Sequence, residues 1–177
     1  MKKMLVFVMI VFMSTTLVFS QSWEMVKEGK LGYGPYDGPN ASSFVDESTG
    51  WLVSDEGRVQ KTTNGGMTWT TVREPVVGSE DWKDVGFADA NTGYACAGEG
   101  FIFKTTDGGD TWTMVGDTAN YKADLEGLAV VSADVAYFAG DDSTLLKTTN
   151  GGNDFTHSDY GFNGEDLDGG IAFTDAD

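Results

Sequence analysis

The sequence predicts an all-β fold, and three observations support this prediction. One stretch of the chain recurs three times at a step of 43 residues. Each copy holds short segments that are rich in aromatic and β-branched residues and bounded by Gly, Asn and Asp, which is typical of strands. Outside the N-terminal segment, no window shows an apolar period of 3.6 residues, so α-helices are not expected.

The repeat is clearest in a nine-residue stretch. It reads KTTNGGMTW at 61–69, KTTDGGDTW at 104–112 and KTTNGGNDF at 147–155. Three further columns keep the same step: Phe44, Phe87, Val130 and Phe173; Trp51, Tyr94 and Tyr137; Val59, Ile102 and Leu145. Columns of unrelated residue types on one period exclude coincidence and identify a structural repeat.

Each unit is predicted to hold four short strands, and the second unit shows them best. We expect them at residues 85–88, 93–97, 101–105 and 111–115. The prolines agree with this assignment, because a proline inside a central strand removes a ladder hydrogen bond. All three prolines are expected between strands: Pro35, Pro39 and Pro75.

The turn between the third and fourth strands is predicted to be structural. Its Asn or Asp accepts hydrogen bonds from its own backbone, and its glycines supply positive φ. The following Trp is expected to be buried and to hold the turn against its sheet. Since the acceptor oxygen is already used, no ligand or metal is predicted there. The assigned residues are Thr62, Asn64, Gly66, Thr68, Trp69, Thr105, Asp107, Gly109, Thr111, Trp112, Thr148, Asn150 and Gly152.

Repeated four-stranded antiparallel units of this length predict a β-propeller, in which neighbouring blades cover both faces of each sheet. The units are expected at 43–74, 82–116 and 124–158, with the start of a fourth at 169–177. Residues 22–26 resemble the last strand of a unit and would complete a final blade. The chain is therefore expected to be the N-terminal part of a longer propeller.

The Gly-Gly turns resemble the Asp-box, or BNR, motif. The longer pattern, with Thr-Gly-aromatic at 49–51 and 92–94, resembles the repeats of photosystem II assembly/stability factor-like propellers. The resemblance covers residues 43–177 and implies a parent of six or seven blades. Asp154-Phe155 replaces Thr-Trp in the third copy, which predicts a looser turn. Similar repeats occur in sialidases, sortilin-type receptors and xyloglucan hydrolases, so the resemblance favours a fold and leaves the function open.

The N-terminus is typical of a secretory signal peptide. Two lysines precede an apolar run over 4–18, and residues 18–20 offer a cleavage site before Gln21. The run is short for a membrane span, although an uncleaved anchor helix is the alternative. Residues 1–20 are therefore predicted to be removed, leaving a secreted, periplasmic or cell-surface chain without a membrane span. The lone Cys96 is expected to be a buried core residue.

Composition excludes several function classes. The chain has 28 acidic and 11 basic residues and a net charge of −17, which argues against a nucleic-acid partner. One cysteine and one histidine exclude an internal disulfide, a Cys-rich zinc site and most histidine-based catalysis. The Asp-x-Asp-x-Asp-Gly order of a calcium loop is absent from the sequence. No metal site and no cofactor are predicted.

A recurring set of carboxylates is the candidate binding site. Loops between the second and third strands share one face of a propeller with the loops between blades. This acidic rim could attract a cation or a basic segment of a partner, or could serve solubility alone. Its members are Asp55, Glu56, Asp81, Glu99, Asp124, Asp141, Asp142 and Asp166.

Two functions follow from these patterns. The first is an exported, non-catalytic propeller that binds a protein or a surface polymer. The alternative is a glycoside hydrolase of the sialidase or xyloglucanase kind. Sialidase chemistry needs several arginines, and the chain has Arg58 and Arg73 alone. Inverting hydrolysis needs two carboxylates about 6.5–9.5 Å apart, which the sequence leaves open. A role in photosystem assembly rests on the family resemblance.

Overall fold

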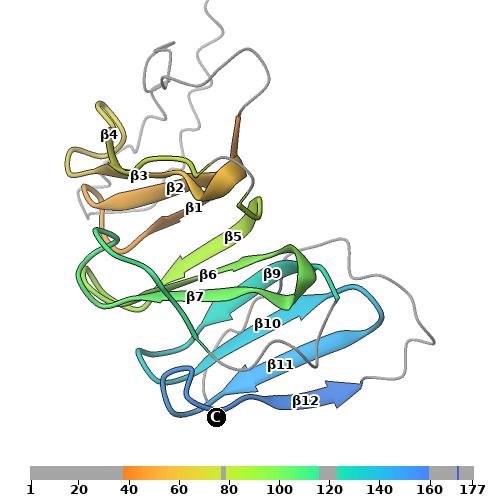
Figure 1. The fold of residues 1–177 in the computed structure, drawn as a ribbon. Coiled ribbons are helices and arrows are strands. Elements are labelled where there is room, and N and C mark those ends of the chain that lie inside the picture. Colours follow the sequence, from red (N-terminus) through yellow and green to blue (C-terminus); the bar gives the residue numbers. More distant parts are fainter. Residues whose placement is uncertain (1–37, 77–78, 116–122, 160–170, 172–177) are drawn as a thin grey trace, which may run out of the picture.

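The computed structural model describes residues 38–76, 79–115, 123–159 and 171. Its strands form three four-stranded antiparallel sheets, here called blades 1, 2 and 3 (Figure 1). Blade 1 contains β1 (Pro39–Phe44), β2 (Gly50–Ser54), β3 (Val59–Thr62) and β4 (Thr70–Arg73). Blade 2 contains β5 (Trp82–Phe87), β6 (Gly93–Ala97), β7 (Ile102–Thr105) and β8 (Thr113–Met114). Blade 3 contains β9 (Leu125–Val130), β10 (Ala136–Gly140), β11 (Thr144–Thr148) and β12 (Thr156–Asp159).

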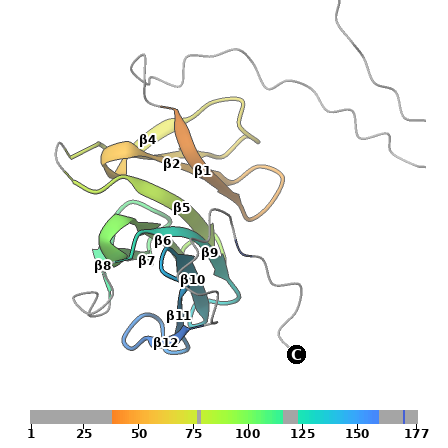
Figure 2. The same cartoon turned by 90° about the vertical axis from the view of Figure 1, so that its right-hand side faces the viewer.

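The all-β fold class is confirmed. Helical structure in the described part of the chain is limited to two three-residue 3₁₀ turns, η1 (Asp55–Gly57) and η2 (Gly98–Gly100). In every sheet the strands lie side by side in chain order. The first strands of successive blades pack against each other, β1 on β5 and β5 on β9 (Figure 2). The three sheets are therefore arranged like neighbouring blades of a propeller.

The first strand of each blade is longer than the sequence predicted. In blade 2 it begins at Trp82 instead of residue 85, because a bulge between Trp82 and Asp84 shifts the register. The bulge turns both Trp82 and Val85 into the core, which hides the alternation that marks a strand. The placement of Pro39 between strands was wrong, since it is the first residue of β1, where proline is tolerated.

The core lies between the sheets. All five residues of β6 are buried, and they alternate between two clusters. Ala95 and Ala97 belong to the cluster shared with blade 1, whereas Tyr94 and Cys96 belong to the cluster shared with blade 3. Burial raises the pKa of the Cys96 thiol well above its usual value, so this thiol is an inert core group, as expected.

In blades 1 and 2, a lysine in the third strand ties the blade to the next one. Lys61 Nζ lies 3.2 Å from the carbonyl of Gly108, in the β7–β8 turn. Lys104 Nζ lies 2.9 Å from the equivalent carbonyl of Gly151, in the β11–β12 turn. Each ammonium also sits over the ring of the preceding strand, Lys61 over Trp51 at 5.1 Å and Lys104 over Tyr94 at 5.1 Å. The repeated lysine is thus part of the contact between blades.

The aromatic column also reaches backbone carbonyls of the next blade, in the β7–β8 turn for Trp51 and in the β9–β10 turn for Tyr94. Trp51 Nε1 donates to Gly108 O at 2.8 Å, and the Trp51 ring stacks on Phe87 at 3.6 Å between centroids. In the next interface Tyr94 Oη donates to Ala133 O at 2.8 Å. The column is therefore a set of ring-and-donor side chains that bridge two blades.

Several predicted features lie outside the described residues. These are the signal peptide at 1–20, the strand at 22–26 and, apart from residue 171, the fourth unit at 169–177. In the part of the chain that the structure describes, no helix has the length and apolar character needed to cross a bilayer.

Candidate functional site

In each blade, the turn between the third and fourth strands is closed by hydrogen bonds to its own side chains. In blade 2, Thr105 Oγ1 accepts the Gly109 N–H at 3.0 Å and donates to Asp107 Oδ1 at 2.8 Å. The same Asp107 oxygen accepts the Thr111 N–H at 2.9 Å. The Thr111 hydroxyl and then its N–H lower the pKa of Asp107 to about 2. Matching bonds are made in the other two blades by Thr62, Asn64, Gly66 and Thr68 and by Thr148, Asn150 and Gly152.

The prediction that the turn of the third copy is looser was wrong. Asp154 N donates to Asn150 Oδ1 at 3.0 Å, and Asn150 Nδ2 donates to Asp154 Oδ2 at 2.8 Å. In blade 2 the carboxylate of Asp107 accepts from a hydroxyl, whereas in blade 3 an amide donates to the carboxylate of Asp154. Donor and acceptor have exchanged places, so the turn closes equally well.

The tryptophans after these turns are half-buried, which corrects the expectation of a fully buried anchor. Trp112 meets Trp82 edge-on at 4.9 Å and Phe87 at 5.9 Å. Trp69 meets Phe44 edge-on at 6.0 Å. Both turns lie at the outer strands, where one side of the ring remains in contact with solvent.

At the opposite end of each blade, the turn between the second and third strands carries two residues in the left-handed region. In blade 1 these are Glu56 (φ 54°) and Gly57 (φ 65°), and in blade 2 Glu99 (φ 53°) and Gly100 (φ 75°). The Arg58 N–H closes the first turn on Asp55 O, as a two-residue hairpin requires. A left-handed Glu costs about 1 kcal/mol, so each turn needs support from outside it.

That support comes from carboxylates of the predicted acidic rim. Asp81 Oδ1 accepts the Glu56 N–H at 3.0 Å, and Asp124 Oδ1 accepts the Glu99 N–H at 2.8 Å. Asp81 and Asp124 belong to the links that lead into the next blade. One carboxylate of each pair is thus used by the backbone, while the turn glutamate itself is half-buried in blade 1 and exposed in blade 2.

The structure brings the rim residues together in two groups. Asp55, Glu56 and Asp81 surround the end of blade 1, and Asp55 also accepts a hydrogen bond from Asn40 Nδ2 at 2.8 Å. The second group joins blades 2 and 3, since Asp124 accepts the Glu99 N–H with its side chain and the Asp141 N–H with its carbonyl. Asp142 follows Asp141 and is exposed, whereas Asp166 lies outside the described residues.

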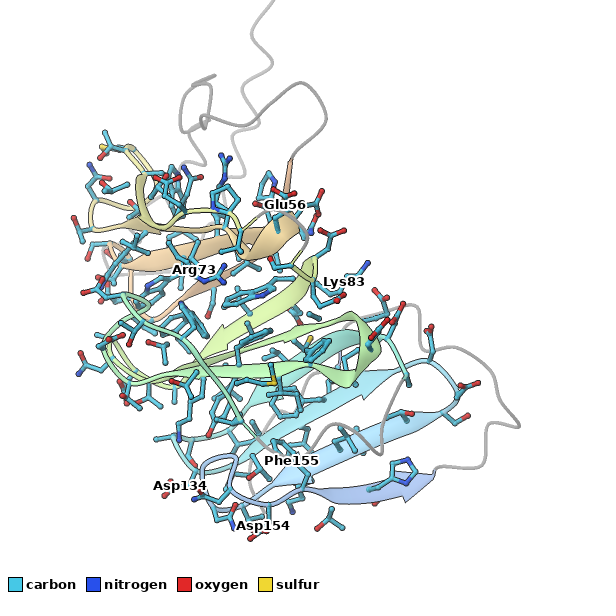
Figure 3. The ribbon with its side chains drawn as sticks, viewed as in Figure 1. Glu56, Arg73, Lys83, Asp134, Asp154 and Phe155 are labelled. Carbon is cyan, nitrogen blue, oxygen red and sulfur yellow. The ribbon has the colours of Figure 1, made fainter. Side chains whose placement is uncertain are left out.

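A hollow of about 300 Å³ opens beside the first group. Its lining residues are Ser54, Asp55, Glu56, Arg58, Pro75 and Asp81. Figure 3 shows Glu56 and Lys83 near this end of the sheets, with Asp134 and Asp154 at the far end. The hollow is mainly polar and carries a predominance of negative charge.

Sequence reasoning missed Asn40, Arg58 and Arg73 as neighbours of this site. Arg73 donates to Gly57 O and lies 5.0 Å from the Trp82 ring, and burial lowers its pKa. These residues change from copy to copy, so the repeat gave no signal for them. Among the described residues, no group of three or more His, Cys, Asp or Glu side chains could hold a metal ion.

Successive four-stranded antiparallel sheets, packed through their first strands, define the chain as part of a β-propeller. The solved structures that it matches include a YCF48 bound to D1 peptide, with a TM-score of 0.60 and 21% identity over 71% of this chain and 44% of that one. YCF48 from Cyanidioschyzon merolae gives a TM-score of 0.57 and 21% identity over 68% and 37%. An ancestral GH74 enzyme gives 0.50 and 18% over 67% and 17%.

These likenesses establish the propeller fold. The chain spans less than half the length of the two YCF48 structures. No protein-family model and no curated protein matches the sequence.

Proposed function

We propose that this protein is a non-catalytic propeller scaffold that binds a basic segment of a partner protein on its acidic rim. The observation that carries the proposal is the repetition of one device in two neighbouring blades. Glu56 and Glu99 occupy the same turn position, and each is held there by the carboxylate that follows in the next link. Fixed like charges on one face attract a cationic ligand and set its orientation.

The two ends of the blades have different duties in this proposal. At the far end, Asp107 is bonded to Thr105 and Thr111 of its own turn, which makes it a structural acceptor. At the rim, the side chains of Glu56 and Glu99 have no such partner in their turns. The peptide bound to the similar YCF48 structure supports a peptide as the class of ligand.

We further propose that the three closed turns are Asp-box repeats and that residues 1–20 direct export. Expression of the full chain in a secreting host should yield a mature protein that begins at Gln21. Mass spectrometry of the intact secreted protein tests this. Retention of residues 1–20 on a membrane-bound product would favour the anchor-helix alternative.

Binding is tested with a short Lys/Arg-rich peptide and a Glu-rich counterpart of equal length. Fluorescence anisotropy should show binding of the basic peptide and none of the Glu-rich peptide. The affinity for the basic peptide should fall as the salt concentration rises. The double variant Glu56→Gln with Glu99→Gln should raise Kd about tenfold. The control is Glu47→Gln with Asp110→Asn, which removes two exposed charges at the other end of the blades.

Equal binding of both peptides, or equal losses in the rim variant and the control, would refute the proposed site. Assays on xyloglucan and on sialosides test the non-catalytic part of the proposal. Release of sugar from either substrate would replace the scaffold by the hydrolase alternative.

A further inference from the structure

Two of the turns between the third and fourth strands contain the dipeptide Asn-Gly, at which asparagine loses its side-chain amide most readily. Glycine has no side chain to hinder attack by its own backbone nitrogen. The sequence has Asn-Gly at 64–65, 150–151 and 163–164, and the structure describes the first two. Both of these asparagines are exposed. The two sites occupy the same place in their blades and differ in the side chain four residues later.

Loss of the amide begins when the glycine nitrogen attacks Cγ of the asparagine. A C–N bond forms, the side-chain nitrogen leaves as ammonia with the proton of the attacking N–H, and a cyclic imide remains. Water then opens the imide at either of its two C–N bonds. The product is aspartate in the normal backbone or isoaspartate in a lengthened backbone, and both carry a new carboxylate.

The closed turn slows the first step at both sites. Gly65 N donates to Ser48 O at 2.8 Å. Gly151 N donates to Asp134 O at 3.0 Å. An N–H that is held by a carbonyl in this way is not free to attack the asparagine. Reaction therefore requires the turn to open, and local opening of an exposed turn costs less free energy than global unfolding.

The closed turn pairs two side chains, and the three described blades use three different combinations of them. Blade 1 pairs an amide with a hydroxyl, since Asn64 Nδ2 donates to Thr68 Oγ1 at 2.9 Å. Blade 2 pairs a carboxylate with a hydroxyl, since Thr111 Oγ1 donates to Asp107 Oδ2 at 2.5 Å. A hydroxyl accommodates either partner because it can both donate and accept.

Blade 3 pairs an amide with a carboxylate. Asn150 Nδ2 donates to Asp154 Oδ2 at 2.8 Å. An ionised carboxylate accepts hydrogen bonds and cannot donate them, so Asp154 needs the amide of Asn150. Deamidation would place two carboxylates in this contact, where they repel each other and neither supplies a donor. None of the described blades uses such a pair.

The turn of blade 3 is also part of the contact with blade 2. Lys104 Nζ donates to Gly151 O at 2.9 Å. Gly152 packs so closely on blade 2 that a Cβ at this position would lie 2.9 Å from the Val115 side chain. Opening of this turn therefore loosens the contact between the two blades.

We propose that Asn150 is a deamidation site whose product opens its turn and loosens blade 3 from blade 2. Deamidation of Asn64 to aspartate has no such effect, because it gives blade 1 the carboxylate–hydroxyl pairing that blade 2 already uses. The replacement of Thr by Asp154 is what makes the difference, since it removes the hydroxyl that tolerates either partner.

The aspartate product is reproduced by substitution. Asn150→Asp should lower the midpoint of urea unfolding by about 0.5 M, whereas the matched variant Asn64→Asp should leave it unchanged. Asp154→Thr gives blade 3 the pairing of blade 1 and should be tolerated. Added to Asn150→Asp, it gives blade 3 the pairing of blade 2 and should restore the midpoint. Circular dichroism verifies that each variant is folded.

The reaction itself is followed by incubating the purified protein at mildly alkaline pH and mapping its peptides by mass spectrometry. Aspartate and isoaspartate should accumulate at position 150, and faster in urea below the unfolding transition, because urea favours opening of the turn. Persistence of Asn150 through the incubation would overturn the proposal. Equal midpoints of the two Asn→Asp variants, or a double variant that remains as unstable as Asn150→Asp, would overturn it as well.

Discussion

The two interfaces between blades use different side chains at matching positions. Between blades 1 and 2, Trp51 stacks on Phe87 and donates to the carbonyl of Gly108. Between blades 2 and 3, Tyr94 takes the place of Trp51 and donates to the carbonyl of Ala133 instead. In both interfaces the acceptor is a backbone carbonyl of the next blade, in the β7–β8 turn for Gly108 and in the β9–β10 turn for Ala133. A side chain suits the position if it brings an apolar ring and a donor to that place.

The first strands of the blades also use different side chains as hydrogen-bond acceptors in the two interfaces. The Phe87 N–H donates to Ser43 Oγ at 3.1 Å across the first interface. Across the second, the Leu128 N–H donates to Asp84 Oδ2 at 2.8 Å, while Asp84 Oδ1 accepts the Val85 N–H. Burial raises the pKa of Asp84 against these two bonds. The first interface thus depends more on aromatic packing and the second more on hydrogen bonds.

The largest effect is expected for Trp51→Ala. The side chain is fully buried, and its loss removes the stack on Phe87 and the bond to Gly108. We expect unfolding to become easier by about 3–5 kcal/mol. Tyr94→Phe keeps its ring and should cost about 0.5–1.5 kcal/mol, because Lys104 still donates to Ala133 O. Urea denaturation measures both, and similar losses would contradict the difference between the interfaces.

The second effect is expected for Asp84→Asn. The amide offers one acceptor oxygen where the carboxylate offers two, so either Val85 or Leu128 loses its partner. We expect a loss of about 1–3 kcal/mol. Ser43→Ala removes the matching bond to Phe87 and should cost less, because aromatic packing dominates that interface. The midpoints of urea unfolding measure both losses of stability. A larger loss in Ser43→Ala than in Asp84→Asn would contradict the comparison.

A smaller effect is expected for the lysines. Lys104 Nζ contacts two carbonyls, those of Ala133 at 3.2 Å and Gly151 at 2.9 Å, whereas Lys61 contacts one. Lys104→Met should therefore cost more than Lys61→Met, by about 1 kcal/mol. Methionine keeps the contact with the ring and removes the donor. Thermal unfolding of the two variants provides the measurement, and equal melting temperatures would exclude a role for the second carbonyl.

The smallest effect at neutral pH is expected for Asp107→Asn. Blades 1 and 3 close the same turn with Asn64 and Asn150, so the turn should remain folded. The lowered pKa of Asp107 stabilises the protein above about pH 4, and this contribution is lost as pH falls toward 2. The variant should lose part of that acid sensitivity. The remaining acid sensitivity comes in part from Asp46, whose pKa is also lowered to about 2 by its hydrogen bond with Ser48.

Acid titration of stability checks this last expectation. Parent and variant should converge as the pH approaches 2 and differ most above pH 4. If the free energies of unfolding of parent and variant differed by the same amount at every pH, the Asp107 carboxylate would contribute nothing beyond what an amide supplies.

Much of the fold could be predicted because its signals are local. The 43-residue step, the short strands and the Gly-Gly turns lie within single units of the sequence. The bulge at Trp82 was hidden because it breaks the alternation on which strand prediction depends. The closure by Asp154 was missed since a motif records residue types, and the exchange of donor and acceptor keeps the geometry while changing both types.

The candidate site was predictable as a set of residues and not as an arrangement. The shared face of Glu56 and Asp81 follows from the order of loops in a blade. Their hydrogen bond depends on the left-handed backbone of Glu56, which no propensity favours for a glutamate. The partner of Lys61 lies 47 residues away, in another blade, and periodicity alone could not identify it.

The bond between Trp51 and Gly108 joins residues 57 apart, which is more than one repeat and less than two. Contacts of this kind link each unit to its immediate successor, so the stability of the array is a sum of blades and neighbouring pairs. Any blade can then serve as the place where folding starts, and order spreads outward from it one unit at a time. The loop that must close at each step stays the same length however many units follow, which keeps the entropic barrier of each addition constant.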